Sequence, residues 1–547
     1  MKFRTTKPWY KRRRYWTLAF LAILFYFCFV PSPLKILPET TGITEPLLPN
    51  GEVDYFGAYE KLYIHKLSPP EDNGQRLLIA ACGPRILDQQ YLMDQISSWE
   101  ELPTHERSKQ WFHEKWVPLC EHMYIDQYAK PRFHDSLGFH EFLYQERKAK
   151  QEDASRWNKE DDELWDQLVA APWTAEDHPD IARWLEERSP VLDLFGVAVR
   201  KPNFACYRWR EKDTTAILLP DVQGNLDFAR DLRVRIAKHL TNGDVDGAWY
   251  DVMSMFYLSR KHYVNDPFLV VALIGARIEN LGWEAANLVL QYGKPSIEQL
   301  EQFAKDLDSL PRTMVFDTAF EKMQLFSLVV NEPEYKLATL GLDGSSTDIN
   351  IQFPFLRYLP FDRNIVGKRI TEFNNVERKI SGDGTWNINW TVMKKHIEAR
   401  DDFVRLKMWQ LRNPLNWWRF LFIRTRSELI ADDLILTYAP ALQAAQYGLV
   451  RANAQFDLLR LAVALERYKS VNEAYPATLD ELVPAFLEEV PLDAFTGRKT
   501  LTYKLAPDAE TAYLLYSYGT NEVDDGGVKY NPYSSDIVLR MMRLPTY

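Results

Sequence analysis

The sequence predicts a mainly α protein of helical hairpins, with one N-terminal transmembrane helix and a small α+β module at the C-terminus. Three observations indicate this: an uncharged apolar run near the start, helix caps and apolar stripes through the middle, and strand-forming residues before an acidic loop at the end. At 547 residues the chain is long enough for more than one globular unit. Its net charge of −10 argues against a nucleic-acid partner.

The N-terminal region has the pattern of a membrane anchor. A basic tail, residues 1–14, precedes an uncharged apolar run that extends through residues 15–34. About 20 such residues span a bilayer core. Because positive charge collects on the cytoplasmic side, we expect the tail in the cytoplasm and the body outside it, so that the membrane itself is a partner.

A cleaved signal peptide is the alternative interpretation of this run. Bulky Phe29 and Val30 lead directly into Pro31, which leaves no small-x-small cleavage site. The residues therefore favour an uncleaved anchor.

Three cysteines follow the predicted anchor, namely Cys82, Cys120 and Cys206. In an oxidising compartment two of them could form a disulfide and leave one over. A set of buried free thiols is the other interpretation. Their spacing does not resemble a zinc site.

The body divides into a proline-rich tether at 35–76 and a helical domain at 77–446, interrupted by an irregular insertion at about 331–384. Ser296 and Gln299 form a capping box before an apolar stripe of helical spacing. Consecutive helical hairpins are expected, somewhat as in tetratricopeptide arrays, although no second strong copy recurs at a fixed period.

The C-terminal module spans residues 447–547. A helix with one apolar face comes first, and the strand-forming segments TLTYKL and AYLLYSY follow it. An ordered set of residues in this module resembles the globular part of the type II secretion major pseudopilin. The matching residues are Tyr468, Tyr475, Pro476, Leu479, Leu482, Pro491, Leu492, Asp493, Gly497, Tyr503, Tyr516, Ser517, Gly519, Asp536 and Ile537.

The closing loop of that family holds calcium, so the resemblance implies a structural calcium ion here. Asp524, Asp525 and Asp536 supply negative charge, and a hard cation would offset the entropy cost of ordering the loop. Asn521 stands where the family has an aspartate, which removes one charge, and the Tyr518 carbonyl is a further candidate ligand. A solvated acidic hairpin without an ion is the alternative.

The start of the chain lacks the GFTLxE pattern of pseudopilins, so we do not expect a pilin subunit. The chain resembles large uncharacterised bacterial envelope proteins that end in such modules, which implies the inner membrane and a link to a secretion or pilus-like assembly. No catalytic motif is evident, since the segment HEKW at 113–116 lacks the second histidine of a zinc protease.

Two functions remain open. The first is a membrane-anchored extracytoplasmic scaffold or binding protein with an envelope protein partner. The second is a hydrolase with an unlocated Asp/Glu or His/Asp site in the helical domain. A deep pocket with convergent carboxylates or a His/Asp pair would favour the hydrolase, and a shallow apolar groove would favour the binding protein.

Overall fold

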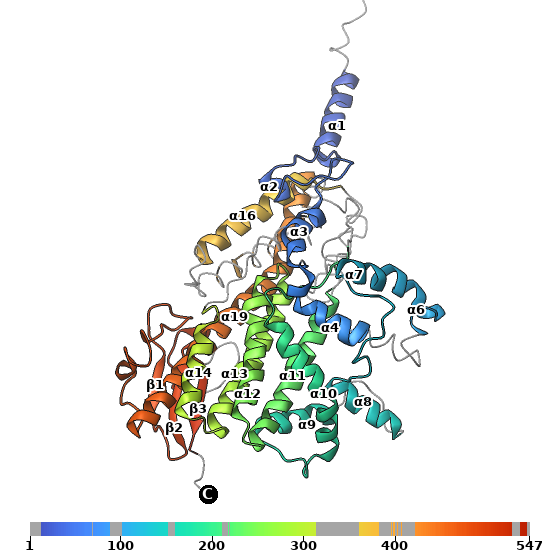
Figure 1. The fold of residues 1–547 in the computed structure, drawn as a ribbon. Coiled ribbons are helices and arrows are strands. Elements are labelled where there is room, and N and C mark those ends of the chain that lie inside the picture. Colours follow the sequence, from blue (N-terminus) through green and yellow to red (C-terminus); the bar gives the residue numbers. More distant parts are fainter. Residues whose placement is uncertain are drawn as a thin grey trace, which may run out of the picture. The chain divides into compact units, whose positions relative to one another are not determined.

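The computed structural model describes residues 13–67, 69–87, 101–150, 159–209, 217, 219–312, 360–381, 422–527 and 536–543, with single positions at 326, 395, 398, 399, 402, 406 and 419. These residues are mainly helical and contain one small three-stranded sheet (Figure 1), which confirms the mainly α prediction. The chain separates into two compact units. Unit 1 comprises Met1–Tyr59, Glu211–Ala216 and Ala319–Gln443, and unit 2 comprises Glu60–Arg210, Ile217–Thr318 and Ala444–Tyr547.

The predicted transmembrane anchor at 15–34 is wrong. Helix α1 covers Arg13–Phe29, which is 17 residues, and none of the helices in the described part of the chain is long and apolar enough to cross a membrane. The helix ends before Pro31 because a proline disfavours the helical conformation of the residue preceding it. The single-pass topology, the membrane as a partner and the inner-membrane location all depended on that span and are withdrawn with it.

Unit 1 contains α1, α2 (Pro38–Thr41), the start of α3 (Tyr55–Tyr63), α16 (Arg363–Ser381) and the first part of α19 (Ile423–Asn472). The Asp362 carboxylate accepts a hydrogen bond from the Ser32 backbone N–H at 3.1 Å, and Arg426 donates to the Cys28 carbonyl at 2.6 Å. Segments far apart in the sequence are thereby joined. Within the stretch expected to be a tether, Val53 is fully buried, so this stretch has more fixed structure than its proline content predicts.

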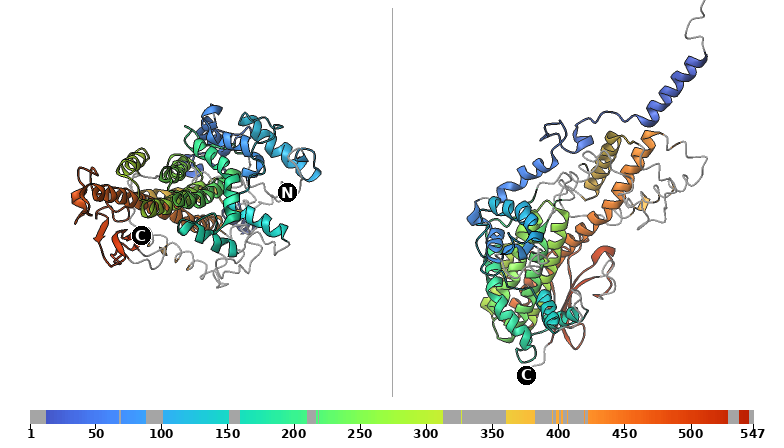
Figure 2. Two further views of the ribbon diagram at one scale, coloured as in Figure 1. Left: turned by 60° about the horizontal axis from the view of Figure 1, so that its bottom comes forward. Right: turned by 90° about the vertical axis from the view of Figure 1, so that its right-hand side faces the viewer.

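Unit 2 is built from helices, and three of them form its centre. Helices α11 (Pro220–Thr241), α12 (Val245–Phe256) and α13 (Leu269–Tyr292) pack against one another and stay adjacent, in green, in the turned views of Figure 2. The shorter elements around them are η2 (Ile64–Leu67), η3 (Pro70–Asp72), α4 (Gly74–Cys82), η4 (Gly83–Leu87), α6 (Glu106–Trp111), η6 (Phe112–Trp116), α7 (Val117–His122), α8 (Phe139–Ala149), α9 (Lys159–Ala170), α10 (Pro179–Val199), η8 (Tyr257–His262), η9 (Tyr263–Asn265) and α14 (Ile297–Asp308).

Local signals in the sequence account for several of these helices. The Ser296 hydroxyl accepts a hydrogen bond from the Gln299 N–H and the Gln299 side chain accepts one from the Ser296 N–H, which confirms the predicted capping box at the start of α14. The described residues from 170 to 312 contain no strand. The irregular insertion expected at 331–384 lies largely outside the described residues, and its later part includes α16.

A buried ion pair fixes one junction of the helices in unit 2. Arg260 in η8 and Glu279 in α13 are both fully buried, with 2.6 Å between Nε and Oε1. The guanidinium also donates to the Ala452 carbonyl of α19 at 3.1 Å and lies 3.6 Å from the ring centre of Phe456. The charged Arg260 side chain therefore joins η8, α13 and α19, and its charge is paired and hydrogen-bonded within the protein.

The C-terminal module lies in unit 2 and contains the end of α19, η13 (Leu479–Leu482), β1 (Thr502–Leu505), β2 (Thr511–Ser517), η14 (Gly519–Asn521) and β3 (Ile537–Met542). The strands form an antiparallel sheet in the order β1-β2-β3, with Leu515 opposite both Tyr503 and Leu539. Every residue of the central strand is buried, as its nearly continuous apolar sequence indicates. Both predicted strands are present.

Candidate functional site

The loop predicted to hold calcium follows β2 and η14, and it closes on Asp536 at the start of β3. The Asp536 side chain is almost wholly buried, with 3% of its surface exposed, and its Oδ2 accepts the Gly527 N–H at 2.7 Å. Its Oδ1 is buried without a hydrogen-bond partner among the described residues. Burial raises the pKa of Asp536, and the negative charges of Asp525 and Asp524 raise it further.

The other predicted ligands are engaged within the loop itself. Asp524 Oδ1 accepts from the Tyr516 hydroxyl and from the Gly526 N–H, each at 2.9 Å. Asp525 Oδ2 accepts from the Asn521 amide at 2.8 Å. In the ranges that the structure describes, no group of three or more His, Cys, Asp or Glu side chains is arranged to hold a metal ion. The structure therefore brings the three aspartates into one loop without forming a complete coordination shell, and calcium stays a prediction.

Lys504 supplies a positive charge at the same loop. Its Nζ donates to the Gly526 carbonyl at 3.2 Å and lies 4.9 Å from the ring centre of Tyr516. The ammonium group also interacts electrostatically with Asp524 and Asp536, and its pKa is raised, chiefly by its hydrogen bond with Tyr516. Part of the negative charge is thus offset within the chain.

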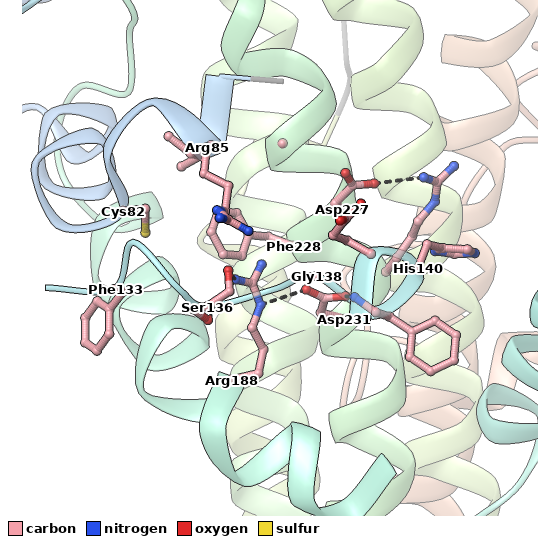
Figure 3. Close-up of a pocket in the computed structure, with 15 residues that line it drawn as sticks. Cys82, Arg85, Phe133, Ser136, Gly138, His140, Arg188, Asp227, Phe228 and Asp231 are labelled. Atoms are coloured by element: carbon pink, nitrogen blue, oxygen red, sulfur yellow. Dashed lines mark hydrogen bonds and ion pairs between the residues drawn. The ribbon is translucent and has the colours of Figure 1, made fainter. Parts of the chain in front are cut away.

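A second site, which sequence reasoning missed, is a pocket in unit 2 that we call the arginine pocket (Figure 3). Its cavity volume is about 80 Å³. Residues from α4, η4, α8, α10 and α11 surround it, together with the segment that precedes α8. The lining residues are Cys82, Arg85, Ile86, Phe133, Ser136, Gly138, Phe139, His140, Glu141, Arg188, Gly224, Asp227, Phe228, Arg230 and Asp231.

Arg188 and Asp231 form the buried wall of the arginine pocket. Arg188 Nε lies 2.9 Å from Asp231 Oδ2, and the other carboxylate oxygen accepts the Phe139 N–H at 3.0 Å. Arg188 Nη1 donates to the Ser136 carbonyl at 3.3 Å and hydroxyl at 3.1 Å. Burial raises the pKa of Asp231 to about 6, although Arg188 and the Phe139 N–H act in the opposite direction. Both oxygens of this carboxylate are already used in holding the wall.

Asp227 lies one helical turn before Asp231 on α11 and faces the same pocket. It accepts hydrogen bonds from Arg230 at 2.9 Å and from Gln223 at 3.2 Å, and both bonds end at Oδ1. Its side chain is 43% exposed. Burial nevertheless raises the pKa of Asp227, because desolvation within the pocket outweighs the attraction of Arg230.

The thiol of Cys82 is the nucleophilic group in the pocket. Burial raises the pKa of Cys82 to about 11, so the thiol is protonated at neutral pH and is a poor nucleophile. Cys120 and Cys206 are likewise buried and free, which supports the free-thiol interpretation of the three cysteines.

Among the histidines, His140 lines the pocket, with its Nε2 3.5 Å from Asp162 Oδ1. His122 instead makes a hydrogen bond with the Pro118 carbonyl. The sequence patterns did not identify Arg188 and Asp231 as site residues. Their one signal is that each is a charged residue at a helix position that the apolar pattern predicts to be buried.

No protein-family model, curated protein or solved structure matches this chain in the comparisons with known proteins. The resemblance of the C-terminal module to a pseudopilin therefore stays a prediction from the sequence.

Proposed function

We propose that this chain is a binding protein, in which unit 2 takes a small ligand in the arginine pocket. The C-terminal pseudopilin-like module, stabilised by calcium, would be its docking end for a protein partner. The arginine pocket is the observation that carries this proposal. Its wall is fixed by hydrogen-bonded buried charges, whereas Arg188 Nη2 and Asp227 Oδ2 make no hydrogen bond with the described residues and are left for a ligand.

The alternative function, a hydrolase, has less support from the same pocket. Asp227 and Asp231 are two carboxylates in one cavity, as a hydrolase would need. However, both oxygens of Asp231 accept hydrogen bonds from groups that are themselves buried, so it is poorly placed to move a proton to or from a substrate. The protonated thiol of Cys82 does not supply a nucleophile.

The buried Oδ1 of Asp536 supports the calcium part of the proposal. A buried carboxylate oxygen without a hydrogen-bond partner costs stability, and a cation bound there would offset the cost. Asp524, Asp525, Asn521 and the Tyr518 carbonyl would complete the shell after small rearrangements of the loop. The residues fit calcium, which accepts irregular sets of oxygen ligands, better than magnesium, which requires a strict octahedron.

A thermal-melting screen of the full chain against a library of small polar metabolites tests the binding function. A ligand at one hundred times its Kd stabilises the folded state by about 2.7 kcal/mol. We expect at least one compound to raise the melting temperature of the wild type and to leave the Gly138→Ala variant, in which the added methyl group lies in the pocket, unchanged. A library in which no compound separates the two proteins would refute the function.

Calcium titration of the full chain tests the module separately. We expect calcium to raise the melting temperature of the module relative to chelator, and magnesium to raise it much less. Asp536→Asn should abolish the calcium response. Asp480→Asn, the same substitution at an exposed position of the same module, should retain it. An Asp536→Asn protein that responds to calcium like the wild type would leave only a solvated acidic hairpin.

A further inference from the structure

Arg188 is the residue of the arginine pocket that indicates an anionic ligand. The residue is only 6% exposed, and its guanidinium is held by Asp231 at Nε, by Ser136 at Nη1 and by the Phe228 ring, whose centre is 4.6 Å away. Among the described residues, none accepts a hydrogen bond from Nη2. In Figure 3, Arg85 and Arg188 extend toward Phe228 from opposite sides. A fixed buried guanidinium with donors to spare is suited to a carboxylate or phosphate oxygen.

The N-terminus of helix α8 adds to this positive potential. Gly138 is the N-cap of this 11-residue helix and lines the pocket. The first backbone N–H groups of a helix carry partial positive charge. Asp231, from another helix, accepts from one of them, the Phe139 N–H, and also pairs with Arg188. Arg188 and the start of α8 therefore place donors and positive charge on the same side of the pocket, which Asp231 offsets in part.

Asp227 gives the pocket a hydrogen-bond acceptor at a defined distance from the Arg188–Asp231 pair. It is four residues before Asp231 on α11, and such residues lie about 5–6 Å apart on one helix face. Because both of its hydrogen bonds with described residues end at Oδ1, its second oxygen is left to accept from a ligand. A ligand that fits both ends carries an oxyanion and, close to it, a hydrogen-bond donor.

The cavity volume limits the size of this ligand. One water molecule needs about 10–15 Å³ on this measure, so the pocket of about 80 Å³ holds roughly five to eight such positions. That is the size of a small organic acid. A nucleotide would not fit, and a doubly charged phosphate brings one more negative charge close to Asp227 than a carboxylate does.

We propose that the arginine pocket binds a small carboxylic acid that carries a hydroxyl or amino group beside its carboxylate. The carboxylate meets Arg188 Nη2, and the hydroxyl or amino group donates to Asp227. This inference rests on the proposed binding function of unit 2 and adds the chemical class of the ligand.

Isothermal titration calorimetry of the full chain tests the proposed chemical class of the ligand. The five probes are lactate, serine, acetate, ethanolamine and inorganic phosphate. We expect lactate or serine to bind at least tenfold more tightly than acetate, which lacks the donor, and than ethanolamine, which lacks the carboxylate. Phosphate should bind more weakly than either acid. Equal affinities for acetate and the two acids, or tighter binding of phosphate, would overturn the assignment.

Two variants locate the binding. Asp227→Ala, which removes the acceptor, should reduce the preference for lactate or serine over acetate to about twofold or less without weakening acetate binding. Gly138→Ala should abolish binding of both acids, and Glu298→Gln, an exposed change on α14, should have no effect. If the metabolite library yields a ligand of another class while lactate and serine fail, this inference is wrong and the binding function stands. If the library yields none, both are wrong.

Discussion

Two glycines that line the arginine pocket, Gly224 and Gly138, should respond in opposite ways to the same added methyl group. A Cβ at Gly224 would lie 2.2 Å from the Ile86 carbonyl oxygen, a backbone atom of η4. Ordinary contact begins near 3.4 Å, so η4 would have to move by more than 1 Å. Overpacking of this kind costs about 3 kcal/mol, and the better helix propensity of alanine returns about 1 kcal/mol. We expect Gly224→Ala to lower the free energy of unfolding by about 2 kcal/mol.

At Gly138 the added Cβ would lie 3.6 Å from Asp231 Oδ2 and 3.9 Å from Arg188 Nη2, which are ordinary contact distances. The backbone angles there, φ −68° and ψ 163°, suit alanine as well as glycine. Replacing glycine by alanine at an N-cap costs about 0.5–1 kcal/mol, and the stiffer unfolded chain returns about as much. We expect Gly138→Ala to change the free energy of unfolding by less than about 0.5 kcal/mol.

Urea unfolding followed by tryptophan fluorescence measures both changes under one set of conditions. With a urea dependence of about 2–3 kcal/mol/M, a loss of 2 kcal/mol moves the midpoint down by roughly 0.7–1 M. The reasoning fails if Gly224→Ala unfolds at the wild-type midpoint, or if Gly138→Ala falls as far as Gly224→Ala.

Three further predictions concern stability. Ser296→Ala should lower the free energy of unfolding by about 1 kcal/mol in the same urea assay, because the capping box is lost; an unchanged midpoint would contradict the cap. Glu279→Gln should cost about 3–5 kcal/mol because it leaves the buried Arg260 charge unpaired, whereas Asp180→Asn, at an exposed ion pair, should cost less than about 1 kcal/mol. Because the pKa of Asp231 is raised to about 6, the folded state holds this proton more tightly than the unfolded state, so stability should fall as pH rises from about 4 to 6; a profile that Asp231→Asn leaves unaltered would contradict this.

Local signals in the sequence predicted the helices and strands well. The capping box of Ser296 and Gln299 placed the start of α14, and the apolar run of β2 indicated its burial. The N-terminal helix is shorter than its apolar run predicts, because the run continues through Pro31 whereas the prolines end the helix at Phe29.

The arginine pocket could not be predicted because it depends on contacts between distant parts of the chain. Cys82, Gly138, Arg188 and Asp231 come from four separate segments, and no spacing in the sequence relates them. The sequence does contain one indication of the pocket. Arg188 and Asp231 are charged residues on otherwise buried helix faces, and buried charges are stable only when they are paired.

A crystal structure of the full chain grown with saturating lactate or serine tests the proposed ligand of the arginine pocket most directly. We predict that the carboxylate lies at hydrogen-bond distance, about 2.7–3.2 Å, from Arg188 Nη2, and that the hydroxyl or amino group lies at the same distance from Asp227. A pocket that contains only water at saturating concentrations of both acids would contradict the proposal.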